Sequence, residues 1–187
     1  MRIIAGQFKG RTLQAPTWDG LRPTSDALRE TIFNILGPRL AEAVVLDLCA
    51  GTGALGLEAL SRGAARATFV DDDARAVALI AANAARCGVA DRCMIVRANA
   101  VGALADDIGG PFDVVLADPP YDTPWTADAL AAAARQLAPG GVIVLEHAWR
   151  RPPPAVAALS LVRTRRAGDS ALSTYRQAGG DDEATRP

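Results

Sequence analysis

The chain has 187 residues, of which 50% are hydrophobic and 22% are charged, and this composition excludes a disordered or collagen-like chain. Its 20 basic and 21 acidic side chains leave a net charge of −1, which excludes a uniformly basic nucleic-acid binder but not a local basic patch. The length fits one domain with a small addition, and we expect a β-hairpin extension over residues 1–20, the main domain over 21–178 and a disordered tail over 179–187.

The N-terminal residues predict a small β-hairpin. Residues 2–5 and 11–15 are short extended runs on either side of a turn that contains glycine. Arg2, Lys9 and Arg11 make this unit positively charged. A solvated edge hairpin and a phosphate-binding surface explain these charges equally well. Because the unit precedes the main domain, we expect a chain without its first 15 residues to fold.

A helix is expected after Pro23, with Thr24 or Ser25 as its N-terminal cap. Gly37 and Pro38 end it. Apolar residues at helical spacing predict one buried face, formed by Leu28, Ile32, Ile35 and Leu36.

From Val44 onward, short apolar runs alternate with helical patterns. Strands are expected over residues 44–49, 67–70, 94–97, 114–117 and 142–146. Helices are expected over residues 54–62, 74–86, 101–106 and 127–137. The apolar stripe of the second of these helices consists of Val77, Ile80, Ala81 and Ala84. This order predicts an α/β fold, with a parallel sheet covered by helices on both faces.

The end of the chain breaks this alternation. After the proline run at 152–154, residues 159–165 and 171–176 are typical of strands, and residues 168–170 of the turn between them. No helix fits between the two strands, so we expect them to pair as an antiparallel hairpin.

A glycine loop follows the first of the predicted parallel strands. Gly51, Gly53 and Gly56 match the pattern GxGxxG, and Asp71 lies 20 residues after Gly51, at the end of the next strand. At this spacing a carboxylate holds the hydroxyl groups of a ribose. The pattern therefore predicts a cofactor that contains adenosine.

Asp47 stands just before the glycine loop. Its carboxylate would repel a pyrophosphate, whereas S-adenosylmethionine carries a sulfonium and an ammonium group. We therefore favour S-adenosylmethionine over a dinucleotide. A glycine turn that serves only strand-to-helix packing is the alternative.

The turn Asp118-Pro119-Pro120-Tyr121 follows the strand at 114–117, at the edge where open α/β sheets bind ligands. An amino group can donate one N–H to the Asp118 carboxylate and the other to the Pro119 carbonyl, which aims its lone pair at a methyl donor. Tyr121 can stack on a flat base. An ordinary Pro-Pro turn is the alternative, and the presence of two motifs at neighbouring strand ends weighs against it.

The chain resembles the RsmD family of bacterial 16S rRNA guanine-N2 methyltransferases over nearly its whole length, to about Gln177. The resemblance rests on the segments MRIIAGQFKGR, LRPTSDALRETIFNIL, VLDLCAGTGALGLEALSRGA, DPPY and GDSALSTYR. The first two are more specific than AGTG or DPPY, which many methyltransferases share.

This resemblance implies a class I S-adenosylmethionine-dependent methyltransferase with a Rossmann-like seven-stranded sheet, in the order 3-2-1-4-5-7-6 with strand 7 antiparallel. It implies methyl transfer to N2 of one guanine, guanine 966, during small-subunit assembly. The partner would be 16S rRNA in a partly assembled 30S subunit, and the protein would be a cytoplasmic monomer that binds no metal or membrane.

The motifs and the resemblance together assign site residues. Cofactor binding is expected from Thr24, Asp47, Ala50, Gly51, Thr52, Gly53, Asp71, Asp72, Asn99, Ala100 and Asp118. The expected catalytic residues are Asp118, Pro119, Pro120 and Tyr121. RNA contacts are expected from Arg2, Lys9, Arg11, Arg22, Arg29 and Tyr121.

Three positions depart from the family pattern. Asp71 and Asn99 stand where the family usually has Glu and Asp, and Ala27 replaces a larger, often basic residue. Asp71 should still reach the ribose, and Asn99 can still accept a hydrogen bond from the adenine amino group. None of the three removes a reacting group.

Other functions compete with this interpretation. One class is another amino-nitrogen methyltransferase, acting on RNA, DNA adenine or protein glutamine. The other is a non-catalytic module that binds RNA or the cofactor. DNA enzymes usually carry an inserted recognition domain, for which this chain has no room, and glutamine enzymes prefer Asn at the position of Asp118.

Metal and membrane binding are not expected. The three cysteines, Cys49, Cys87 and Cys93, lack paired spacing and suggest reduced thiols, and His147 is the only histidine. A single histidine of this kind is more often structural than catalytic. No uncharged apolar run is long enough to span a bilayer.

Overall fold

A computed structural model describes residues 1–18, 24–121 and 123–179. Its central feature is a seven-stranded sheet in the order β3-β2-β1-β4-β5-β7-β6, which confirms the predicted topology. The predicted tail falls almost entirely on residues 180–187, outside the described part of the chain.

Five neighbouring strands of the sheet are parallel. They are β1 (Val44–Leu48), β2 (Arg66–Asp71), β3 (Cys93–Arg97), β4 (Phe112–Ala117) and β5 (Leu137–Ala148). The last two strands, β6 (Leu159–Ala167) and β7 (Ser170–Gln177), form the predicted hairpin, and β7 runs antiparallel to both β5 and β6. The loops that follow the five parallel strands therefore all lie at the same end of the sheet, where the strands have their carboxyl ends.

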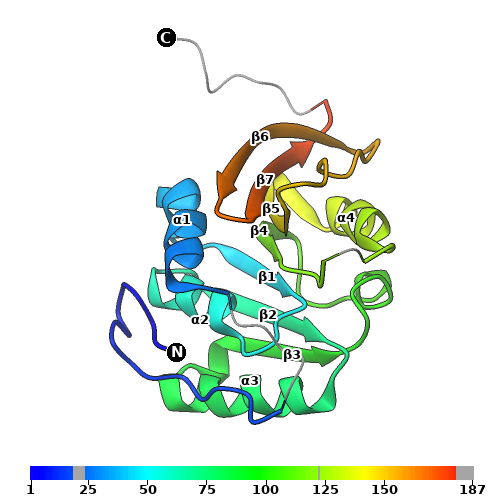
Figure 1. Cartoon of the computed structure of the whole chain (residues 1–187). Helices are drawn as coiled ribbons and strands as arrows, with labels where there is room; N and C mark the ends of the chain where they lie inside the picture. The colour runs from blue at the N-terminus through cyan, green and yellow to red at the C-terminus, as the bar shows by residue number, and fades with distance from the viewer. Residues whose placement is uncertain (19–23, 122, 180–187) are drawn as a thin grey trace.

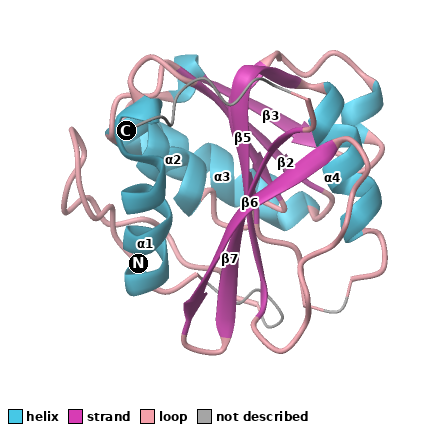
Figure 2. Cartoon of the chain, turned by 90° about the horizontal axis from the view of Figure 1, so that it is seen from above, coloured by secondary structure: helices cyan, strands magenta, loops and turns pink. Residues whose placement is uncertain are grey.

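Helices cover both faces of the sheet (Figures 1 and 2). One face carries α1 (Asp26–Leu36), α2 (Ala54–Ser61) and α3 (Ala74–Cys87), whose apolar side chains form one buried cluster with the strands. The other face carries α4 (Thr126–Arg135) and a second buried cluster. The helix expected over residues 101–106 is wrong, since the chain forms only a short 3₁₀ turn at Ala103–Ala105 there.

The predicted stripe of α3 is displaced around the helix. Ala81 is exposed and Val77 is half-buried, whereas Ala76 and Leu79 are buried. The displacement brings a polar side chain, Asn83, onto the buried face, where the N-terminal residues supply its hydrogen-bond partners.

The N-terminal residues are paired less regularly than a hairpin. One antiparallel bridge joins Arg2 to Thr12, while the backbone amides of Ile4 and Ala5 turn away and donate to the carboxylate of Glu58 on α2. The expected pair of extended strands is therefore reduced to a single bridge. The backbone of this segment is held mainly by helix side chains.

The same segment contributes to the hydrophobic core. Ile3, Phe8 and Leu13 are 1%, 7% and 2% exposed and belong to the cluster that includes α1, α2 and α3. Gly6 lies so close to α2 that a Cβ atom there would be 1.9 Å from the backbone oxygen of Ser61. The N-terminal unit is therefore part of the hydrophobic core, which argues against the expectation that a chain without its first 15 residues folds.

The described part of the chain holds no helix of the length and hydropathy that a bilayer crossing requires.

Candidate active site

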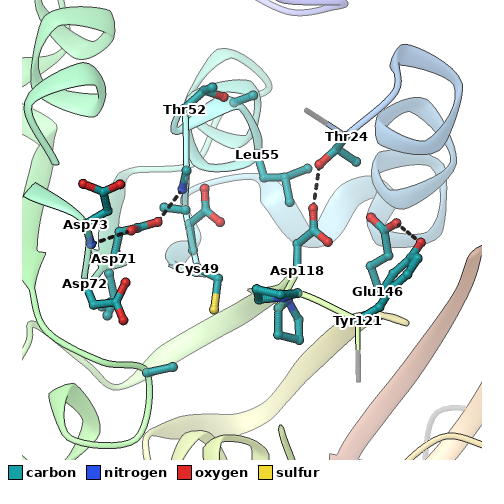
Figure 3. Close-up of a pocket in the computed structure, with 18 of the residues that line it drawn as sticks. Thr24, Cys49, Thr52, Leu55, Asp71, Asp72, Asp73, Asp118, Tyr121 and Glu146 are labelled. Atoms are coloured by element: carbon teal, nitrogen blue, oxygen red, sulfur yellow. Dashed lines mark hydrogen bonds between the residues drawn. The ribbon is translucent and has the colours of Figure 1, made fainter. Parts of the chain in front are cut away.

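A cavity of about 740 Å³ opens at the carboxyl ends of the parallel strands (Figure 3). Its volume is within the range of small-molecule binding sites. The sequence-predicted residues that line it are Thr24, Asp47, Ala50, Gly51, Thr52, Asp71, Asp72, Asn99, Ala100, Asp118, Pro119, Pro120 and Tyr121. The structure thus brings together the two motifs, which are far apart in the sequence.

The glycine loop joins β1 to α2 at the floor of this cavity. Gly53 is the N-cap of α2, and Gly56 lies in the first turn of the helix. A Cβ atom on Gly56 would be 2.3 Å from the ring of Phe69 on β2, so only glycine allows this close helix-to-sheet contact. The third glycine of the motif therefore serves packing, while Gly51 lines the cavity.

Asp47 is buried at the end of β1, with 1% exposure. Its Oδ2 accepts a hydrogen bond from the amide of Gly56 at 2.8 Å, and its Oδ1 is buried without a hydrogen-bond partner among the described residues. Burial raises the pKa of this carboxyl well above its ordinary value, and the nearby Asp118 and Asp71 raise it further. A cationic ligand would satisfy the free oxygen and relieve this unfavourable charge.

Asp71 ends β2 and ties the glycine loop to the next helix. Its Oδ2 accepts from the amide of Gly51 at 2.8 Å, and its Oδ1 accepts from the amide of Asp73 at 3.0 Å. Burial raises the pKa of Asp71, although the two amide donors partly offset that effect. Each carboxylate oxygen keeps a further lone pair for a ligand hydroxyl.

Two other acidic residues beside Asp71 differ in role. Asp73 is the N-cap of α3, and its side chain accepts from the amide of Arg75, as expected for a capping residue. Asp72 is exposed and lines the cavity. Asn99, after β3, accepts from the amide of Gly102 at 2.7 Å and also lines the cavity.

Asp118 follows β4 and receives a hydrogen bond from a segment distant in sequence. The hydroxyl of Thr24 donates to its Oδ2 at 2.6 Å. Burial raises the pKa of Asp118 to about 7, and the neighbouring carboxylate of Glu146 contributes to the increase. The carboxyl that we expect to receive an amino group thus changes charge near neutral pH.

Glu146 and Ser170 are cavity residues that the sequence interpretation missed. Glu146 ends the buried part of β5 at 7% exposure, and its Oε1 accepts from the hydroxyl groups of Tyr121 at 3.1 Å and Ser170 at 2.9 Å. An acidic residue after four buried apolar residues of a central strand was the available signal. Its neighbour His147 does not line the cavity, and its Nε2 is 2.8 Å from the hydroxyl of Ser173.

The predicted RNA contacts lie in different environments. Arg2, Lys9 and Arg11 are exposed, and the guanidinium of Arg11 also donates to the backbone oxygen of Arg86. Arg29 is fully buried, and its Nη2 donates to the backbone oxygen of Arg2 and to Asp26. Its predicted RNA contact is wrong, because a side chain buried by the N-terminal segment cannot reach a phosphate. Arg22 lies outside the described residues.

The hydrogen-bond acceptors of the cavity fit S-adenosylmethionine. The unpartnered Oδ1 of Asp47 suits an ammonium group, and the lone pairs of Asp71 suit ribose hydroxyls. Burial raises the pKa of Asp47, Asp71 and Asp118, and a bound cation would offset that effect. The described residues contain no group of three or more histidine, cysteine or acidic side chains placed to hold a metal ion.

Comparison with known proteins gives the family. The family model described as Conserved hypothetical protein 95 matches residues 1–176. The chain belongs to this family. Within the Conserved hypothetical protein 95 family, the chain is 37% identical to Ribosomal RNA small subunit methyltransferase D of Escherichia coli K12, over 98% of this chain and 94% of that protein. The resemblance to the RsmD family is therefore confirmed.

Solved structures agree with this assignment. The yhhF protein of Escherichia coli matches with a TM-score of 0.84 and 39% identity, over 95% of this chain and 97% of that chain. An RNA methyltransferase from Salinibacter ruber, solved with S-adenosyl-L-homocysteine, matches with a TM-score of 0.66 and 19% identity, over 88% of this chain and 100% of that chain. This second match shows the shared fold, which is that of the class I methyltransferases.

Proposed function

We propose that this chain transfers the methyl group of S-adenosylmethionine to N2 of one guanine in 16S rRNA, and that the substrate is a partly assembled small subunit. The family resemblance supports guanine 966 as the target. The similarity to a relative named for methylation of small-subunit rRNA supports the class of RNA.

One observation carries the proposal. The acidic residues of the glycine-loop side, Asp47 and Asp71, and the turn that begins at Asp118 line the same cavity. A cofactor site and an acceptor site that share one cavity can hold two reactants side by side, and this proximity accounts for much of the rate enhancement of a transfer reaction.

The residues of the cofactor side would divide the binding work. Oδ1 of Asp47 accepts from the ammonium group, Asp71 accepts from the ribose hydroxyls, and Asn99 contacts the adenine amino group. When bound, S-adenosylmethionine supplies an electrophilic methyl group on sulfur.

The residues of the acceptor side would hold the guanine amine. Asp118, when ionised, accepts one N–H of the amine, and the carbonyl of Pro119 accepts the other. The ring of Tyr121, which is 41% exposed at the cavity, stacks on the extruded base. After transfer, the extra proton of the amine can pass to the Asp118 carboxylate, whose raised pKa makes it a suitable acceptor at neutral pH.

RNA binding outside the cavity would use the exposed cations of the N-terminal segment. Arg2, Lys9 and Arg11 can contact phosphates, which position an RNA without reading its sequence. One chain supplies the residues on both sides of the cavity, which supports a protein that acts as a monomer.

Methyl transfer to defined RNA tests the proposal. The protein is incubated with methyl-labelled S-adenosylmethionine and 16S rRNA from a strain that lacks the enzyme, as naked RNA and as immature subunits. We expect label in N2-methylguanosine at a single nucleotide, identified by mass mapping. Transfer to another atom or another class of molecule, or no transfer to either form of the RNA, would overturn it.

A further inference from the structure

Only one of the two carboxylate oxygens of Glu146 has hydrogen-bond partners among the described residues. Its Oε1 accepts from Tyr121 and Ser170, whereas its Oε2 is buried and has no hydrogen-bond partner among the described residues. The side chain is more than nine-tenths buried and lines the cavity beside Asp118 (Figure 3). A buried carboxylate oxygen without a donor is costly, so its retention at this point calls for a ligand that supplies a donor.

We propose that Glu146 is a specificity-determining residue whose Oε2 accepts the N1–H of the target guanine and thereby excludes adenine-like bases. This inference rests on the proposed function, because it assumes that the amine held by Asp118 belongs to a base. It adds a second contact, to the ring nitrogen next to that amine.

The hydrogen-bonding groups on the edge of the base favour guanine beside the carboxylates of Asp118 and Glu146. Guanine presents N1–H and the N2 amino group side by side, so that its edge offers only donors at these two positions. Ionised carboxylates are acceptors only, and Asp118 and Glu146 are neighbours that line the same cavity. Adenine presents an unprotonated N1 beside its amino group, and the lone pair of that nitrogen would face a carboxylate. One base therefore satisfies both side chains, and the other leaves Oε2 unpaired and repelled.

The partners of Glu146 fix its orientation. The hydroxyl of Tyr121 and that of Ser170 lie 2.7 Å apart and both reach Oε1, so they leave Oε2 as the oxygen available to a ligand. Antiparallel pairing of β5 with β7 brings Ser170 close to Glu146, with Ala148 opposite Ser170. The acceptor is thus held by the sheet and by the residue that is expected to stack on the base.

A purine analogue tests the inference directly. Small-subunit rRNA is prepared by ligation with either guanine or 2-aminopurine at the nucleotide mapped as methylated, and it is assayed naked and in reconstituted particles. 2-Aminopurine keeps the amino group but has an unprotonated N1. We expect the wild-type protein to methylate the guanine RNA with a kcat/KM that is roughly 10- to 100-fold higher than for the 2-aminopurine RNA.

Glu146→Gln supplies the converse result. The amide can donate to an unprotonated N1, so the preference for guanine over 2-aminopurine should fall by roughly tenfold or more. Tyr121→Phe and Ser170→Ala are the matched controls, since they remove partners of Oε1 and leave Oε2 in place. Both should lose turnover while they keep the preference for guanine. Thermal unfolding and binding of S-adenosylhomocysteine check that each variant is folded.

The outcomes separate the two proposals. Equal methylation of both RNAs by the wild-type protein overturns the role of Glu146, even if Glu146→Gln fails to fold, and leaves the proposed function standing. An unchanged preference in folded Glu146→Gln also overturns it. If the guanine RNA gained no N2 methylation both as naked RNA and in reconstituted particles, the proposed function itself would be overturned.

Discussion

The hydroxyl of Thr24 donates to Oδ2 of Asp118 across 2.6 Å, although 94 positions separate the two residues. This bond joins the start of α1 to the turn after β4, at the centre of the cavity (Figure 3). It favours the ionised form of a carboxyl that burial and Glu146 drive toward protonation. The charge on Asp118 near neutral pH is therefore set by a balance between burial and Glu146, which favour the protonated form, and Thr24, which favours the ionised form.

The first prediction concerns the pH dependence of turnover. If the ionised form of Asp118 receives the amine, kcat/KM should fall as the pH drops through about 7, the pKa of this carboxyl. Thr24→Val removes a donor that favours the charged form, so the acid limb of the profile should move to higher pH. Glu146→Gln removes a negative neighbour, so the limb should move to lower pH. Profiles of methyl transfer measured under single-turnover conditions check both directions.

Asp118→Asn is the control for this assignment. It removes the titrating group while it keeps an acceptor oxygen, and Asp118→Ala removes both. We expect residual, pH-insensitive turnover from the first variant and a nearly complete loss of kcat from the second, with cofactor binding retained in both. An unshifted acid limb in Asp118→Asn would show that another group controls the profile.

The second prediction concerns cofactor affinity. Asp71→Ala should weaken binding of S-adenosylmethionine by about 2–4 kcal/mol, because two charge-assisted hydrogen bonds to the ribose are removed. The matched control is Asp91→Ala, which removes an exposed carboxylate after α3 that does not line the cavity. Titration calorimetry compares the two, and equal affinities would refute the ribose contact.

The third prediction is that binding of a cationic cofactor releases protons near neutral pH. Asp118 has a pKa of about 7, so near neutral pH it carries a proton in part of the molecules, and a nearby positive charge would displace that proton. Calorimetry in two buffers of different ionisation enthalpy measures this release. S-Adenosylhomocysteine, which lacks the sulfonium charge, should release fewer protons. Identical heats in both buffers would contradict the prediction.

The same raised pKa has a consequence for stability. Asp118 has a pKa of 3.8 as its ordinary value and about 7 in the folded chain, so the folded state binds the proton more tightly than the unfolded state. Its contribution to the free energy of unfolding is therefore full below the lower value and is lost as the pH rises through the higher one. Asp118→Asn should flatten this part of the stability profile.

The fourth prediction concerns the N-terminal segment. Removal of residues 1–15 takes Ile3, Phe8 and Leu13 from the core, and each such side chain contributes about 1.5–3 kcal/mol on burial. Since whole domains are stable by only about 5–15 kcal/mol, we expect the truncated chain to unfold or to melt far below the full chain. Circular dichroism with temperature measures this, and a wild-type melting temperature would show that the segment is dispensable.

The fifth prediction tests RNA binding by this segment without unfolding it. Lys9→Glu reverses an exposed charge, and it should weaken RNA binding and lower the slope of log affinity against log salt by about 0.7 for each phosphate that the protein no longer neutralises. Arg135→Glu makes a comparable change at an exposed side chain of α4, at the other face of the sheet, and should have little effect. Equal salt slopes for the two variants would exclude Lys9 from the RNA interface.

Much of the fold could be predicted because its signals are local. Strand β1, the glycine loop and α2 follow one another without a break, and Asp71 and Asp118 each stand at the end or just past the end of an apolar strand. The parallel order then requires these residues to meet at one edge. Neither residue needed a long-range contact to be recognised.

The missed features depend on contacts that a linear pattern does not encode. Glu146 and Ser170 meet only because β7 pairs with β5 in one particular register. Arg29 has the charge of a surface residue, and its burial follows from the backbone of Arg2 and the Asp26 side chain, which supply acceptors for its guanidinium. Asn83 occupies the buried side of α3 for a similar reason, since it bonds to both Gln14 and Thr52.

The placement of the N-terminal segment also bears on the order in which the chain folds during synthesis. The backbone amides of Ile4 and Ala5 donate to Glu58, and the amide of Gln14 donates to Asn83, which lies 69 positions further along the chain. A chain emerging from the ribosome therefore presents Ile3, Phe8 and Leu13 to solvent until α2 and α3 have been made. These residues are made before their partners in α2 and α3, so they are packed late. A nascent chain stalled before α3 would leave the three apolar side chains open to chaperones and proteases.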